Sequence, residues 1–195
     1  MIERILFVCT GNTCRSPLAK GLLKWLAEKE ALDLDIRSSG VAAIDGMPIS
    51  HHTKAILADR GIQADETSTA MTRELAEWAD LILTMTMSHK RAVVQRFPST
   101  IDKVFTLKEY VEDDPAVLEA IKERESLASE LQLKLSLGQA ITAEEQERLK
   151  QLNAKIPGED VADPFGGSRE DYDRCAMELE GLLVKLVNRL KKETA

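Results

Sequence analysis

The sequence has few aromatic residues, few cysteines and no long apolar run. Aromatic residues make up 4% of its 195 positions, and three residues are cysteine. An odd number of cysteines argues against a disulfide scaffold, and because Cys9 and Cys14 share one short segment beside an arginine, a reactive thiol is the better interpretation. No stretch approaches the roughly 20 apolar residues of a membrane span, and the apolar run near the amino terminus is too short for a signal peptide. We therefore expect a cytoplasmic protein that does not bind membranes.

Basic residues are in the minority. The chain has 26 Lys+Arg against 33 Asp+Glu, a formal net charge of −7. This balance argues against a protein that wraps nucleic acid or lies on an anionic membrane. The acidic excess is concentrated in residues 112–160, which carry 12 acidic and 6 basic side chains, so the other 146 residues have a net charge of only −1.

Short apolar runs alternate with helical segments along most of the chain. Strands are expected at Ile5–Val8, Asp35–Ser39, Leu81–Thr84 and Val104–Leu107, and helices at Ser16–Ala31 (with Ser16 as its N-cap), Ser50–Arg60, Thr72–Ala79, Ser88–Phe97 and Glu170–Lys192. Strands that alternate with helices imply a parallel sheet covered on both faces. We expect an α/β three-layer sandwich with a four-stranded parallel sheet flanked by helices.

Residues 112–160 interrupt this alternation. They contain no aromatic residue and no strand signal, and two helical stretches are separated at Gly138. The second stretch begins with a capping box formed by Thr142 and Glu145. We expect one domain over residues 1–195, with 112–160 as an inserted helical hairpin. The hairpin is either simply solvated or a contact surface for a substrate protein or a second copy, and a monomer is expected.

The segment that bears most on function is Cys9-Thr10-Gly11-Asn12-Thr13-Cys14-Arg15-Ser16, between the first strand and the first helix. Backbone N–H groups of such a loop and the helix N-terminus form a cradle for a phosphate-sized anion, and Gly11 is expected to permit the turn. Arg15 can bind two phosphate oxygens. Cys9 lies in this positive field, which favours a thiolate nucleophile, and Ser16 can donate a hydrogen bond to its sulfur. The seven residues from Thr10 to Ser16 are candidate phosphate-binding residues, and Cys9 is the candidate nucleophile.

A phosphorylated cysteine requires an acid that protonates the leaving group. Pro164 keeps Asp163 out of a helix, so Asp163 can project its carboxyl group for this role and later activate water. His51, His52 and His89 have no ligand spacing with cysteines or carboxylates, so no metal and no other cofactor is expected. The absence of Gly-Lys-Ser/Thr after the loop excludes a nucleoside triphosphate Walker loop.

Three other positions have more ordinary interpretations. His51 and His52 are expected on the surface, in the first turn of a helix. Cys175 is expected on the buried apolar face of the last helix. Phe165 has two interpretations that the sequence leaves open, a loop anchor packed on the core or a substrate contact.

The Cys-x5-Arg-Ser loop and the distant Asp-Pro pair resemble the low-molecular-weight protein tyrosine phosphatase family. The amino-acid sequences of residues 9–17, 104–110 and 163–168 are similar to those of the bacterial protein arginine phosphatase branch. Thr13 replaces the bulky aliphatic residue usual in tyrosine-specific members, and Phe165 replaces their Tyr or Trp. The resemblance implies a protein phosphatase that hydrolyses phosphoarginine in proteins through a cysteinyl-phosphate intermediate. A tyrosine-specific phosphatase of the same family is the alternative.

The resemblance also implies supporting roles around the loop. Asn12 and Ser38, together with Ser16, would hold the loop open, and Cys14 would be the redox partner of Cys9 in a reversible disulfide. Many members have a histidine near the position of Glu66, so the sequence departs from the family pattern there and leaves loop support from that side open.

Two other functions fit the sequence less well. An arsenate reductase that shares the loop needs two more cysteines in its middle region, and none lies between Cys14 and Cys175. A phosphate-binding module without catalysis would leave Arg15 and Asp163 with no joint purpose. The sequence therefore favours a phosphatase over both.

Overall fold

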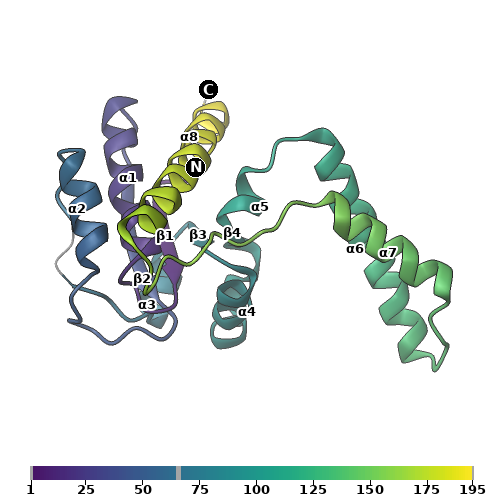
Figure 1. Cartoon of the computed structure of the whole chain (residues 1–195). Coiled ribbons are helices and arrows are strands. Elements are labelled where there is room, and N and C mark those ends of the chain that lie inside the picture. The colour runs from purple at the N-terminus through teal and green to yellow at the C-terminus, as the bar shows by residue number, and fades with distance from the viewer. Residues whose placement is uncertain (1, 65–66, 195) are drawn as a thin grey trace. The chain divides into compact units, whose positions relative to one another are not determined.

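A parallel four-stranded sheet with the order β2-β1-β3-β4 forms the centre of the fold (Figure 1). The structure is a computed structural model that describes residues 2–64 and 67–194. The strands are β1 (Arg4–Cys9), β2 (Asp35–Gly40), β3 (Leu81–Thr84) and β4 (Val104–Thr106). In register, Phe7 of β1 lies between Ser38 of β2 and Leu83 of β3. The four residues from Ile5 to Val8 are completely buried, as is typical of a parallel strand covered on both faces.

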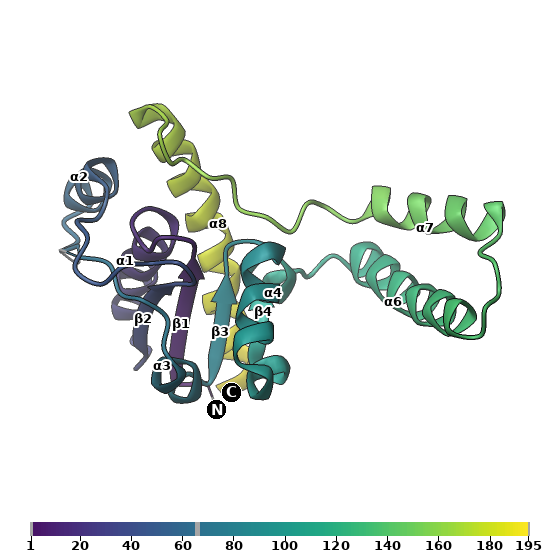
Figure 2. The ribbon, with the colours of Figure 1, turned by 90° about the horizontal axis from the view of Figure 1, so that it is seen from below.

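Helices cover both faces of this sheet. They are α1 (Arg15–Lys29), α2 (His51–Asp59), α3 (Arg73–Trp78), α4 (Met87–Arg96), the 3₁₀ helix η1 (Pro98–Lys103), α5 (Leu107–Val111) and α8 (Arg169–Thr194). Ile5 and Phe7 pack in a core cluster with α1, α2, α5 and α8, whereas Leu6 and Val8 pack in a second cluster with α3 and α4. Figure 2 shows α4 in front of the strands and α8 behind them. The expected three-layer α/β sandwich is confirmed.

Several boundaries differ from the expected ones. Ser16 is not the N-cap of α1: the helix begins at Arg15 after Cys14, and no side chain caps it. Leu107 belongs to α5 rather than to the last strand, because β4 ends at Thr106. Ser50 is the N-cap residue of α2, although its side chain makes no capping hydrogen bond.

Residues 112–158 form a second compact unit, distinct from the described residues before and after them. This unit contains α6 (Pro115–Ser136) and α7 (Ala143–Lys155), which pack around Leu127, Leu131 and Leu152. Gly138 adopts a left-handed backbone with φ 70°, which favours glycine. Both hydrogen bonds of the capping box between Thr142 and Glu145 are present. Within the described part of the chain, no helix is long and apolar enough to span a membrane.

Candidate active site

The loop between β1 and α1 lies at the carboxyl end of the central strand. From β1 the chain passes to β2 on one side and later to β3 on the other, so the loop is at the switch point where ligands bind in open α/β sheets. Backbone hydrogen bonds fix its start: the Val41 and Ala42 amides donate to the carbonyls of Cys9 and Thr10, each at 3.0 Å. The loop is therefore held by the segment that follows β2.

Asn12 organises the interior of the loop. Its backbone is left-handed with φ 54°, a conformation that asparagine tolerates better than most residues, so Asn12 and not Gly11 makes the turn. Its side-chain amide donates to the hydroxyl oxygens of Ser16 at 2.8 Å and Ser38 at 3.0 Å. Its carbonyl oxygen accepts from the Thr69 amide at 2.7 Å. The buried Asn12 thus joins three separate segments.

Ser16 connects this network to Cys9. The hydroxyl oxygen of Ser16 is 3.0 Å from the Cys9 sulfur and 3.3 Å from the Ser39 carbonyl oxygen. Because its oxygen already accepts from Asn12, the single hydroxyl proton of Ser16 is free to point at either partner. A negatively charged sulfur would attract it. This geometry explains why Ser16 acts within the loop instead of capping α1.

The segment after residue 160 brings a carboxylate to the loop. Arg15, which is 5% exposed, donates from Nη2 to Asp163 at 2.8 Å and from Nη1 to the Val161 carbonyl at 3.1 Å. The Val161 amide donates to the Met85 carbonyl at 2.8 Å, just beyond β3. Asp163 also accepts from the backbone amide of Phe165 at 3.1 Å. The structure therefore brings together Arg15 and Asp163, which lie 148 positions apart.

These residues line one cavity of about 230 Å³, which we call the loop cavity. Its walls are formed by Cys9, Thr10, Gly11, Thr13, Cys14, Arg15, Asp163 and Phe165. Cys9 and Arg15 are nearly buried, whereas the Asp163 side chain is about half exposed. A thiol, a cation and a carboxyl group thus converge on a space open to solvent.

Comparison with known proteins agrees with this geometry. The model of the low molecular weight phosphotyrosine protein phosphatase family matches residues 4–123. The protein-arginine-phosphatase of Bacillus subtilis is 36% identical over 189 residues, which cover 97% of each chain. The chain belongs to the low molecular weight phosphotyrosine protein phosphatase family. The low molecular weight protein-tyrosine-phosphatase PtpB of Staphylococcus aureus is 35% identical over 183 residues, or 94% of this chain and 96% of that protein.

A solved structure extends the relation to three dimensions. A mutant of the YwlE arginine phosphatase whose active-site serine is phosphorylated matches this phosphatase with a TM-score of 0.72 and 36% identity. The match covers 97% of each chain. Relatives named for phosphoarginine and for phosphotyrosine are thus similarly close in sequence.

Phe165 is not a loop anchor in this phosphatase. Its side chain is 76% exposed, and it lines the loop cavity instead of packing on the core. Of the two interpretations that the sequence left open, the exposure contradicts the first.

Tyr172 on α8 contacts the loop, a contact that sequence reasoning missed. Its hydroxyl lies 3.1 Å from the Cys14 sulfur, and its ring packs 5.0 Å from that of His52. Burial first, and the hydrogen bond with Cys14 second, raise the pKa of Tyr172 to about 12. The phenol therefore keeps its proton at neutral pH and can donate it to the Cys14 sulfur.

Gly40 at the end of β2 is a second missed residue. A Cβ atom there would lie 2.4 Å from the Thr10 carbonyl oxygen and 2.8 Å from the Asn12 backbone nitrogen, both of which belong to the loop. Only glycine fits without moving the loop. A glycine directly after a predicted strand could have indicated a position with little space for a side chain. The sequence did not show that the backbone of the loop packs against it.

His89 supports the loop from α4. Its Nε2 lies 2.8 Å from the Thr10 hydroxyl oxygen. Burial first, and the positive charge of Arg15 second, lower the pKa of His89 to about 4, so the ring is neutral at physiological pH. Across residues 2–64 and 67–194, no group of three His, Cys, Asp or Glu side chains is arranged to hold a metal ion.

The structure also shows where the two histidines and the third cysteine singled out from the sequence lie. His51 is exposed and His52 half-buried in the first turn of α2. Cys175 is buried on α8, and burial raises the pKa of its thiol to about 12, so it stays protonated and unreactive. Glu66, where many family members have a histidine, lies outside the described residues.

Proposed function

We propose that this phosphatase hydrolyses phosphoarginine in proteins, with Cys9, Arg15 and Asp163 as its catalytic residues. The observation that carries the proposal is the loop cavity, which holds these three side chains together with Thr13 and Phe165. The phosphorylated active-site serine of the related YwlE mutant supports a phosphorylated nucleophile in this family.

The loop binds the phosphoryl group. Its backbone N–H groups and the N-terminus of α1 provide partial positive charge, and the Arg15 guanidinium pairs with two non-bridging oxygens. The Ser16 proton stabilises the Cys9 thiolate at 3.0 Å. Because the interior of the loop is fixed by Asn12, these donors are in place before the charge of the transition state develops.

Hydrolysis takes two displacements. The Cys9 sulfur attacks phosphorus while the bond from phosphorus to the guanidino nitrogen breaks, and protonated Asp163 gives its proton to that nitrogen. Water then attacks the cysteinyl-phosphate, Asp163 accepts its proton, and the sulfur leaves as a thiolate that Ser16 stabilises. The products are unmodified arginine and inorganic phosphate. A phosphotyrosine would follow the same two steps with a phenol as the leaving group.

Thr13 and Phe165 set the preference between these substrates. Thr13 is small and polar, so the planar guanidino group can lie close to the loop and hydrogen-bond its hydroxyl, while the Asp163 carboxyl pairs with guanidino N–H groups. A phosphotyrosine ring favours a slot with apolar and aromatic walls. Phe165 provides one aromatic wall, and residues 40–50 contain no aromatic side chain for an opposite one.

The test is kcat/KM on phosphoarginine and phosphotyrosine peptides of the same sequence. We expect the native enzyme to prefer phosphoarginine, and Thr13→Ile to lower kcat/KM for phosphoarginine by roughly ten- to a hundredfold while that for phosphotyrosine is kept or raised. Thr13→Ser, which keeps the hydroxyl, is the matched control and should retain the preference. A native preference for phosphotyrosine would overturn the assignment and leave the tyrosine phosphatase alternative.

We also propose that Cys14 protects Cys9 by forming a reversible disulfide with it. Both thiols are free, buried and part of the wall of the loop cavity, and a disulfide stops oxidation before it becomes irreversible. After peroxide treatment, thiol reductant should restore most activity to the native enzyme and little to Cys14→Ala. Cys175→Ala removes the buried thiol on α8 and should recover like the native enzyme. Equal recovery of Cys14→Ala would contradict this role.

We infer that the enzyme works as a monomer in the cytoplasm on phosphorylated proteins. All three cysteines are free thiols, which suits a reducing compartment. The half-exposed Asp163 and the exposed Phe165 leave the loop cavity open to a side chain presented by another protein.

A further inference from the structure

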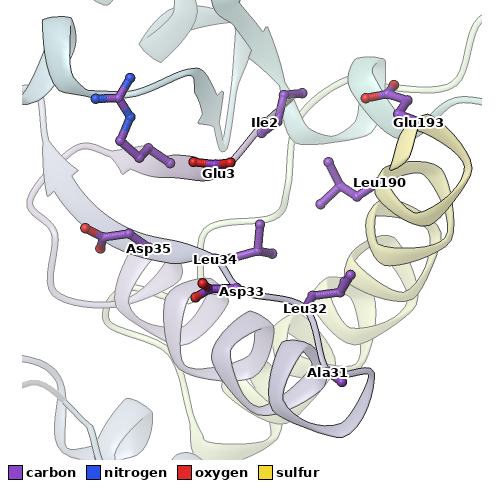
Figure 3. A pocket seen from close by; sticks show the side chains of 10 residues that line it. Ile2, Glu3, Ala31, Leu32, Asp33, Leu34, Asp35, Leu190 and Glu193 are labelled. Carbon is purple, nitrogen blue, oxygen red and sulfur yellow. The ribbon is translucent and has the colours of Figure 1, made fainter. Parts of the chain in front are cut away.

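A second cavity lies at the amino ends of β1 and β2 (Figure 3). Its volume is about 530 Å³, more than twice that of the loop cavity and within the usual range of roughly 300–1,000 Å³ for binding pockets. Three segments surround it: residues 2–4, residues 31–35 between α1 and β2, and the last turns of α8. It shares no lining residue with the loop cavity, so an occupant there would not compete directly with the phosphoryl group.

The inside of the second cavity is aliphatic. Ile2, Leu32, Leu34 and Leu190 point into it, as Figure 3 shows. The first three are only partly buried, although they pack against the same core cluster as α1 and α8. The turn at Ala31, with a left-handed φ of 53°, directs Leu32 back toward the core, and the Leu32 amide closes the turn on the Ala27 carbonyl at 2.9 Å. Partly exposed aliphatic side chains that converge on one cavity favour an apolar occupant.

The rim of the second cavity is acidic. The aliphatic residues alternate with exposed carboxylates, which are Glu3, Asp33, Asp35 and Glu193. Arg4 is the cation among the lining residues, and two of its guanidinium nitrogens bind Asp80, at 2.6 and 3.2 Å.

Glu3 and Asp33 differ from the other two carboxylates of this rim in their partners, although the positive charge of Arg4 also acts on Glu3. Asp35 and Glu193 have arginine partners beside them at 2.9 and 3.2 Å. Among the residues that the structure describes, the carboxylates of Glu3 and Asp33 form no ion pair. The rim therefore has two carboxylates available to a cation from outside.

We propose that the second cavity docks a segment of another protein in which an arginine or lysine is next to a leucine-like residue. The aliphatic side chain fills the space between Leu34 and Leu190, and the cation meets Glu3 and Asp33. β2 is the edge strand of the sheet, and residues 69–71 pair with it only at Gly40, so an extended segment can approach its amino end. The proposal uses no residue of the phosphatase reaction and stands or falls separately from it.

The test measures binding of a fluorescent peptide to the full chain by anisotropy. The probe is Gly-Leu-Arg-Leu-Arg-Leu-Gly, compared with one peptide in which Glu replaces each Arg and another in which Ser replaces each Leu. We expect saturable binding of the probe alone, with an affinity that falls as salt increases. The double variant Glu3→Lys, Asp33→Lys should weaken it by about tenfold or more, because two attractive charge pairs become repulsive.

A matched double variant distinguishes the effect of charge at the second cavity from the effect of the net charge of the whole chain. Asp102→Lys, Glu77→Lys makes the same change in net charge at exposed positions that do not line the second cavity, and it should bind the probe almost like the native chain. Thermal melting followed by circular dichroism checks that both variants are folded. Equal weakening by both double variants, equal binding of the three peptides, or no binding at millimolar peptide would overturn the proposal. So would self-association of the native chain that Glu3→Lys, Asp33→Lys abolishes, because the occupant would then be a second copy.

Discussion

Replacing Cys9 by serine is expected to abolish hydrolysis and to leave phosphate binding largely intact. The serine hydroxyl is a far weaker nucleophile than the thiolate, and removal of a catalytic nucleophile lowers kcat by factors on the order of a million in well-studied enzymes. The anion cradle does not depend on the sulfur, because its donors are backbone N–H groups and Arg15. Activity on a phosphoarginine peptide and calorimetric titration with inorganic phosphate measure the two properties on one sample.

The same experiment separates an enzyme from a phosphate-binding module. Cys175→Ala is the matched control, because its thiol is buried on α8 and does not line the loop cavity, so hydrolysis and phosphate binding should both be kept. Full hydrolysis by Cys9→Ser would show that the nucleophile lies elsewhere. Joint loss of hydrolysis and of phosphate affinity would show that the sulfur holds the loop together instead of attacking phosphorus.

Asp163→Asn is expected to lower kcat by roughly a hundred- to ten-thousandfold, the usual contribution of a general acid. The amide can still face Arg15, but it has no acidic proton for the leaving nitrogen. The loss in kcat/KM, which reports the first displacement, should be much smaller with p-nitrophenyl phosphate, because its leaving group is stable without a proton. kcat/KM on the two substrates is therefore a readout that simple damage to the loop would not reproduce.

Asp160→Asn is the matched control for this variant. Asp160 lies on the same segment, and its carboxylate accepts a hydrogen bond from the Met87 amide at 2.8 Å, which an asparagine oxygen can also accept. Its kcat should stay within a fewfold of the native value. Equal losses of kcat/KM for Asp163→Asn on both substrates would contradict a proton-donating role and favour a purely structural one.

Sequence reasoning succeeded where the determinants are local. The apolar run of Ile5–Val8 predicts a buried strand, and the residues after it predict a loop that leads into a helix, as observed. Pro164 places Asp163 in a loop by the same local logic, and the structure brings that carboxyl group to Arg15.

Sequence reasoning failed where the role of a residue depends on a partner that is distant in the chain. Ser16 has the composition of an N-cap, but the buried amide of Asn12 and the Cys9 sulfur use its hydroxyl instead. Tyr172 lies 158 positions from Cys14, and no local pattern links them. Gly40 resembles any glycine at a strand end until the loop backbone is seen against it. These contacts depend on how the layers pack, which composition and periodicity do not encode.

The inserted unit of residues 112–158 is attached in a way that allows its length to vary between related enzymes. Val111 before this unit and Val161 after it are both buried in the core cluster that contains Cys9. Backbone hydrogen bonding of Val161 to Met85 then fixes the chain just two residues before Asp163. The segment that carries Asp163 is thus held by an anchor of its own, so this point of the chain can accept, lengthen or lose a module while the distance between Asp163 and Cys9 is preserved.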